Sequence, residues 1–103
     1  MYYRGIYDFD SLKGADLVGF SALMLEAFRR YEEVYYHQSE GQLGERLWRG
    51  FEAGMRDINV YPGVQAWWRS RSHFFSEEFA NHISQLQQTA KAPRLYREAN
   101  PDQ

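Results

Sequence analysis

Two pairs of residues combine a carboxylate with an imidazole at a spacing of four: Glu33 with His37, and Glu78 with His82. Residues four apart share one helix face, and such pairs from two helices can bind zinc or iron. Helical di-iron proteins instead use a spacing of three with further glutamates, a pattern that this sequence lacks. Since Glu33 and His37 also fall on a polar helix side, we interpret both pairs as surface pairs and predict no metal or other cofactor.

The sequence offers little for covalent catalysis. It has no cysteine, which excludes disulfides, thiolate catalysis and cysteine metal sites. Its serines fall at predicted caps and polar faces, without a Gly-x-Ser-x-Gly elbow, a phosphate loop or a dinucleotide fingerprint. Acid–base chemistry by Glu32 or Glu33 with Tyr35 or Tyr36 stays open, although tyrosines at helical spacing are more often core residues. We therefore favour a protein without a catalytic site.

The densest group of aromatic residues is at positions 64–75, VQAWWRSRSHFF. Such a group can be a stacking platform for a nucleic acid, a ligand pocket or the inner face of a helix. On a helix, its apolar members gather on one side, and we expect this side to be core. The apolar members are Val64, Trp67, Trp68, Phe74 and Phe75. Trp68 lies nearer the centre of this arc and is predicted to be better buried than Trp67.

Arg71 projects from the middle of this aromatic arc and needs a partner, because an unpaired buried charge is costly. The expected partner is Glu32, at the border of the apolar face of the longest predicted helix. The alternative is that Arg71 anchors an interface or a ligand in an aromatic pocket. The walls of that pocket would be Tyr31, Tyr35, Trp67 and Trp68.

The elements that position these residues are predicted to be helices, because apolar residues recur with the helical period. The first covers about 12–38, with an inner apolar face and a second apolar strip formed by Val18, Leu25 and Tyr36. The inner face is predicted to contain Leu17, Phe20, Met24, Ala27, Phe28, Tyr31 and Tyr35.

Three shorter helices are predicted to follow. The second covers 43–61, with Leu47, Phe51, Met55 and Ile58 inward and a close helix approach at Gly50 and Gly54. A Pro-Gly turn at 61–63 precedes the third, which starts at about Val64. Ser76 is predicted to be the N-cap of the fourth, whose apolar stripe is Phe79, Ile83, Leu86 and Ala90 and which ends at Pro93.

The fold prediction is an all-α, compact bundle of about four helices, one long and three shorter. A short irregular N-terminal segment is expected before the bundle and a flexible C-terminal tail after it. Residues 1–92 would form a single domain, with 93–103 as the tail. The length of 103 residues fits one domain, and the 17% aromatic content suits a globular core.

Charge and hydropathy restrict the partners. The net charge of −2 argues against a dedicated nucleic-acid binder, which is normally basic. No basic-then-apolar leader opens the sequence, and no apolar run approaches the length of a membrane span. We therefore expect no nucleic-acid partner, no membrane span in this chain and a cytoplasmic location.

The order of several landmarks resembles a widespread family of uncharacterised bacterial proteins. The landmarks are RRYEEVYYHQSEGQL, then LWRGF, then YPGVQAWWRSRSHFFSEEF, and the resemblance covers about residues 2–87. It implies an all-helical fold, of which this chain looks like the C-terminal part, and no established activity. Many members carry a hydrophobic N-terminal segment and a further helix upstream. The chain departs from the family at Lys13-Gly14, where relatives tend to show Asp-Pro.

These observations give two functional hypotheses. The first is a non-enzymatic interaction domain that forms a homodimer, or docks a protein partner, through surplus apolar surface at Val18, Leu25 and Tyr36. The second is a module that binds a small apolar molecule in the aromatic pocket near Arg71.

Overall fold

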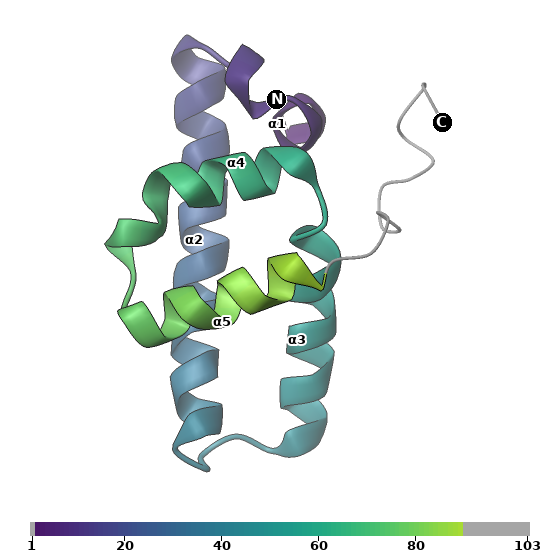
Figure 1. Ribbon diagram of the computed structural model, residues 1–103, viewed down its shortest axis with the longest axis vertical. Coiled ribbons are helices and arrows are strands. Elements are labelled where there is room, and N and C mark those ends of the chain that lie inside the picture. Colours follow the sequence, from purple (N-terminus) through teal and green to yellow (C-terminus); the bar gives the residue numbers. More distant parts are fainter. Residues whose placement is uncertain (1, 90–103) are drawn as a thin grey trace.

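A single long helix, α2, forms the spine of the protein, and the shorter helices pack along it (Figure 1). The computed structural model describes residues 2–89, and no strand occurs among them. The helical elements are α1 (Tyr2–Tyr7), η1 (Phe9–Ser11), α2 (Gly14–Ser39), α3 (Glu45–Ile58), α4 (Pro62–Arg71), η2 (Ser72–Phe74) and α5 (Glu77–Gln88), where η marks a short 3-10 helix. The predicted all-α class, with one long and three shorter main helices, is confirmed.

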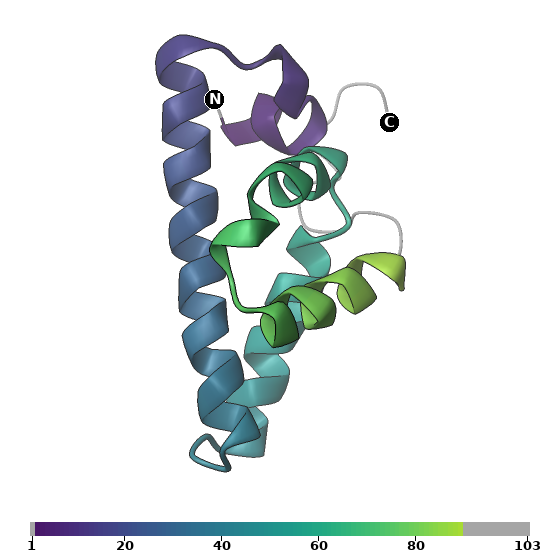
Figure 2. The same ribbon diagram turned by 60° about the vertical axis from the view of Figure 1, so that its left-hand side comes forward.

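The helices form two layers. Helices α2 and α3 run antiparallel, while α4 and α5 lie across them (Figure 1). In the view of Figure 2 every other helix lies on one side of α2. Both the predicted tail at 93–103 and the last predicted residues of the fourth helix, from Ala90 onward, lie outside the described residues.

Local sequence signals explain the helix ends. Ser76 is the N-cap of α5, as predicted, and its hydroxyl accepts a hydrogen bond from the backbone N–H of Phe79 at 3.3 Å. Gly41, with φ of +73°, ends α2 and lets the next N–H bond back to the His37 carbonyl. Pro62 begins α4 slightly earlier than predicted, at a position where its missing N–H costs nothing.

The N-terminal segment, expected to be irregular, contains α1 and η1 and contributes Ile6 and Leu12 to the core. Helix α1 crosses α4 at two glycines. A Cβ atom on Gly63 would collide with the backbone of Gly5, and one on Gly5 would collide with the ring of Phe20. The close approach predicted at Gly50 and Gly54 is wrong, because both positions face open space. Only a residue without a side chain permits the approach at α1 and α4.

The core is built mainly from aromatic rings. Phe28 of α2 stacks on Trp67 and Trp68 of α4, with ring centroids 5.5 and 4.9 Å away. The tryptophans are 1% and 3% exposed, so the prediction that Trp68 is better buried than Trp67 is wrong. Both indoles pack against one phenylalanine, and the two positions are equivalent in depth. The other fully or nearly buried apolar residues are Ile6, Leu12, Phe20, Met24, Tyr31, Met55, Tyr61, Val64, Phe75, Phe79, Ile83 and Leu86.

Two residues predicted to face inward are exposed. Leu47, 67% exposed, lies in the first turn of α3, away from the core. Phe74 is 48% exposed, because the chain leaves the α-helical period at Ser72 and forms the 3-10 turn η2. That change of period rotates Phe74 out of the arc, while Phe75 stays in the core.

Candidate functional site

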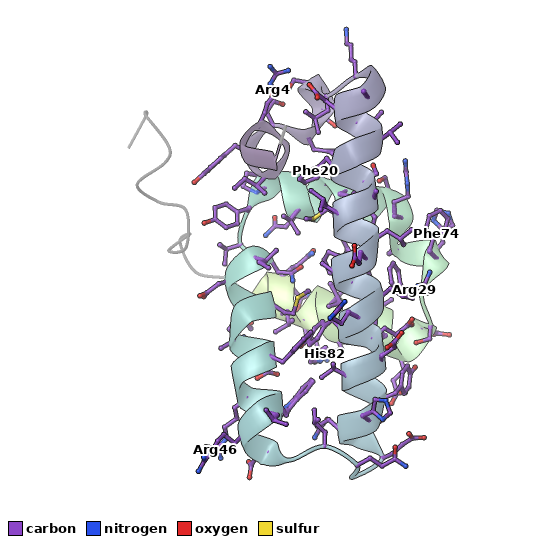
Figure 3. All side chains as sticks on the ribbon, turned by 180° about the vertical axis from the view of Figure 1, so that it is seen from behind. Arg4, Phe20, Arg29, Arg46, Phe74 and His82 are labelled. Atoms are coloured by element: carbon purple, nitrogen blue, oxygen red, sulfur yellow. The ribbon has the colours of Figure 1, made fainter. Side chains whose placement is uncertain are left out.

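The most concentrated chemistry lies where α2, α3 and α5 meet. We name this group the Tyr31–His82 cluster; it comprises Tyr31, Tyr35, Trp48, Phe51, Phe79 and His82. His82 projects from α5 into the space between α2 and α3 (Figure 3). Its Nε2 atom lies 2.8 Å from the hydroxyl oxygen of Tyr31, so the two side chains share a hydrogen bond.

The imidazole of His82 is surrounded by aromatic rings. Its centroid lies 4.8 Å from the ring of Tyr35, 5.7 Å from Tyr31 and 6.0 Å from Trp48. Tyr31 stacks in turn on Phe51 at 5.3 Å. The histidine is therefore part of the packing that joins α5 to the other two helices.

Burial keeps both partners of the hydrogen bond uncharged. It lowers the pKa of His82, with the nearby carboxylate of Glu52 opposing this shift and Arg56 reinforcing it. Burial also raises the pKa of the Tyr31 hydroxyl, with a further contribution from Glu52. At neutral pH the pair is therefore an imidazole and a phenol.

The pKa of Tyr35 is influenced by a different carboxylate, that of Glu78. Burial raises the pKa of Tyr35, and Glu78 raises it further. Glu78 therefore acts on Tyr35, while His82 turns inward to Tyr31. The prediction that Glu78 and His82 form an ordinary surface pair is wrong for His82.

A cavity of about 300 Å³ opens beside His82 between α3 and α5; its other lining residues are Glu52, Arg56, Gln85, Leu86 and Thr89. Arg56 donates to the Thr89 hydroxyl at 3.1 Å and lies 3.8 Å from the Glu52 carboxylate. The carboxylate and the guanidinium on its wall therefore lie close enough to interact with each other.

The other predicted histidine pair lies on the surface. Glu33 and His37 are exposed on α2, and His37 Nδ1 lies 3.2 Å from Gln42 Oε1. Within residues 2–89, no three side chains of His, Asp or Glu come together in a way that could hold a metal ion.

The predicted ion pair between Arg71 and Glu32 is wrong. Arg71 is at the end of α4 and donates to the carbonyl oxygen of Ser70 at 3.3 Å, since carbonyls at a helix end are available acceptors. Glu32 instead pairs with Arg29 at 3.1 Å and accepts the backbone N–H of Ser76 at 3.0 Å. It therefore links α2 to the start of α5.

Arg29 is the cation that the sequence analysis missed. Its guanidinium carbon lies 4.6 Å from the centre of the Phe75 ring, in a cation–π contact, and one nitrogen donates to the Phe74 carbonyl at 3.4 Å. Figure 3 shows Arg29 and Phe74 next to each other at one edge of the molecule. The spacing of three between Arg29 and Glu32 was the available signal for this pairing.

The predicted aromatic pocket near Arg71 lacks its walls. Trp67, Trp68 and Tyr31 are at most 3% exposed and fill the core. Tyr35 is half-buried within the Tyr31–His82 cluster. Three of the four predicted pocket walls are therefore core residues.

The predicted apolar strip on α2 divides into two parts. Tyr36 is half-buried and its hydroxyl lies 2.5 Å from the Ser76 hydroxyl, so α5 covers this end of the strip. Val18, in contrast, is 69% exposed, and Leu25 is half-buried with exposed Ala22 between them. Val18 and Ala22 are therefore exposed at the N-terminal part of the strip, whereas Leu25 packs partly against the core.

Comparison with known protein families, with curated protein sequences and with solved structures gave no significant match. The resemblance to a bacterial family stays a prediction. None of the helices in the described part of the chain combines the length and the apolar character needed to cross a membrane.

Proposed function

We propose that this protein is a helical interaction domain that forms a homodimer through the N-terminal part of the α2 strip. The residues of this surface are Val18, Ala22 and Leu25, which we name the α2 patch. The observation that carries the proposal is the exposure of Val18, a large apolar side chain of α2 that is 69% exposed.

The geometry of the patch suits a second copy of the same chain. Val18 lies four residues before Ala22 and Leu25 three residues after it. If two α2 helices cross antiparallel about Ala22, Val18 of each copy meets Leu25 of the other. A two-fold interface requires such a self-complementary surface, and the small side chain of Ala22 permits a close crossing.

The charged residues beside the patch are compatible with this pairing. Glu26 and Arg30 of α2 lie 3.7 Å apart and stay largely exposed, so each neutralises the other within its own helix. They would form a polar rim around a small apolar centre, as is common at interfaces. Because the patch is short, we expect a weak dimer in exchange with its monomer.

Light scattering over a concentration series tests the proposal. The mass should rise from 12.3 kDa towards twice that value as the concentration increases from about 10 µM to about 1 mM. A mass that stays at 12.3 kDa throughout this range would refute self-association.

The matched pair of variants is Val18→Lys and Leu47→Lys. The two native residues are almost equally exposed, at 69% and 67%, but lie on α2 and α3. Val18→Lys should hold the protein in the monomeric form, because two added charges would face the partner's apolar surface. Leu47→Lys should keep the concentration dependence of the wild type, and equal loss in both variants would show that the patch is not the interface.

A further inference from the structure

We propose that the contact between Tyr31 and His82 is a pH-sensitive latch that holds α5 on α2 and α3 and loosens when His82 takes up a proton. The imidazole is placed at the middle of α5, and its Nε2 atom lies 2.8 Å from the Tyr31 hydroxyl oxygen. The latch does not depend on the proposed dimer, because it involves neither Val18, Ala22 nor Leu25 of the α2 patch.

Besides its buried Phe79, Ile83 and Leu86, helix α5 is held in place by side-chain hydrogen bonds at three levels. At its start, the Ser76 hydroxyl lies 2.5 Å from the Tyr36 hydroxyl and its N–H bonds to Glu32. At its end, Gln87 donates to Asn59 at 2.8 Å. Between them lies His82, the only one of these side chains whose ordinary pKa lies near neutrality.

Protonation changes what the imidazole can do. A neutral histidine can accept a hydrogen bond from the Tyr31 hydroxyl through Nε2, whereas an imidazolium can only donate from both nitrogens. The charge would also have to be accommodated among the rings of Tyr35, Trp48 and Phe79, whose centroids lie 4.8, 6.0 and 6.5 Å away. Loosening of α5 returns the charged ring to water.

The charged and titratable groups around His82 come from all three helices. Tyr31 and Tyr35 of α2 are phenols whose pKa values are raised mainly by burial. Glu52 of α3 favours the imidazolium and Arg56 disfavours it. Glu78, one turn earlier on α5, acts on Tyr35. Burial is the largest influence on the pKa of His82, and it favours the neutral form.

The direction of the pH effect follows from these shifts. A loosened α5 exposes His82, whose pKa then approaches the ordinary value of about 6.5. The pKa of His82 is lower when α5 is docked, so docking is fully favoured above about pH 6.5. Docking weakens as the pH falls from there to the pKa of docked His82. Below that pKa a further fall in pH does not change the docking equilibrium. One proton changes the open population by at most about tenfold per pH unit.

Hydrogen exchange on the full chain between pH 7.5 and 5 tests the latch. After correction for intrinsic rates, protection of the amides in Glu77–Gln88 should fall below about pH 6.5 by up to about tenfold per pH unit, relative to those in Pro62–Arg71. In His82→Gln the profile should be flat, and in His37→Gln, an exposed control, it should match the wild type. A flat wild-type profile, or an unchanged slope in His82→Gln, would overturn the proposal.

A second measurement keeps the proposal testable if His82→Gln does not fold. The pKa of His82, followed by its ring proton resonances, should fall in Glu52→Gln and rise in Arg56→Gln, with the drop in α5 protection moving by the same amount. The controls are Glu45→Gln and Arg49→Gln, an exposed pair at the same spacing on α3. A His82 pKa at or above about 6.5 in the wild type, or one that neither variant moves, would contradict the latch.

Discussion

Both sides of α2 contain apolar residues, but only one side is covered by other helices. On one face Phe20, Phe28 and Tyr31 are fully buried, because α1, α3, α4 and α5 lie opposite them (Figure 2). Val18, outside this face, is 69% exposed. Apolar character alone is therefore not sufficient for burial. Burial depends on whether the chain supplies an opposing surface, and the other helices all lie on one side of α2 (Figure 2).

The largest expected effect lies on the covered face. Trp67→Ala and Trp68→Ala should each lower the free energy of unfolding by about 3–5 kcal/mol, because each removes a buried indole stacked on Phe28. Urea denaturation at low protein concentration measures both. If either variant unfolds at the same urea concentration as the wild type, the packing of α4 against α2 is not as described.

A smaller effect is expected at the Tyr31–His82 cluster. Tyr31→Phe keeps the ring stacked on Phe51 and deletes the hydroxyl bonded to His82, so it should cost about 0.5–1.5 kcal/mol of unfolding free energy at pH 7.5. Tyr36→Phe is the matched control, because its hydroxyl bonds to Ser76 in an exposed setting and should contribute less. An equal cost for the two variants would mean that the hydrogen bond between Tyr31 and His82 stabilises the fold no more than the exposed one between Tyr36 and Ser76.

The smallest effect is expected on the uncovered face. Val18→Lys should change the unfolding free energy of the monomer by no more than about 0.5 kcal/mol, as substitutions at exposed positions usually do. Urea denaturation below the dimerisation range provides the measurement. A cost above about 2 kcal/mol would place Val18 in the folded core rather than on a free surface.

The sequence allowed prediction of features that depend on local chemistry. The apolar period located α2 and its buried residues, and the serine before two glutamates located the N-cap of α5. In both cases the signal and the structure lie within one helix, so the helical period or the first turn is enough. The same argument placed Phe79, Ile83 and Leu86 in the core.

The predictions that were wrong concern features that depend on neighbours outside the local pattern or on a change of helix type. The helical period alone placed Leu47 inward, but the next residue, Trp48, packs on Tyr31 of α2, and Leu47 is 67% exposed. The α-helical period was extended through Phe74, where the chain forms a 3-10 turn. Glu32 was paired with Arg71, although Arg29 is nearer in sequence and reaches it at 3.1 Å.

The candidate site was only partly visible in the sequence. Tyr31 and Tyr35 were identified as candidates, but His82 was assigned to the surface with Glu78. The spacing of three between Phe79 and His82 places the histidine at the border of the apolar stripe, which is the one signal that could have located it. Its partner lies 51 residues earlier on another helix, and no local pattern encodes that distance.

The direct test of the contrast between the two faces is a cross-link at the centre of the α2 patch. The chain has no cysteine, so Ala22→Cys introduces a single thiol, and Ala53→Cys places the control at an exposed position of α3. An antiparallel crossing about Ala22 would bring the two thiols within disulfide range, with Cα atoms about 4.4–6.8 Å apart. Under mild oxidation we expect Ala22→Cys to give a covalent dimer of twice the 12.3 kDa chain mass, far faster than Ala53→Cys. Equal rates for the two variants, or no dimer from Ala22→Cys, would contradict the account.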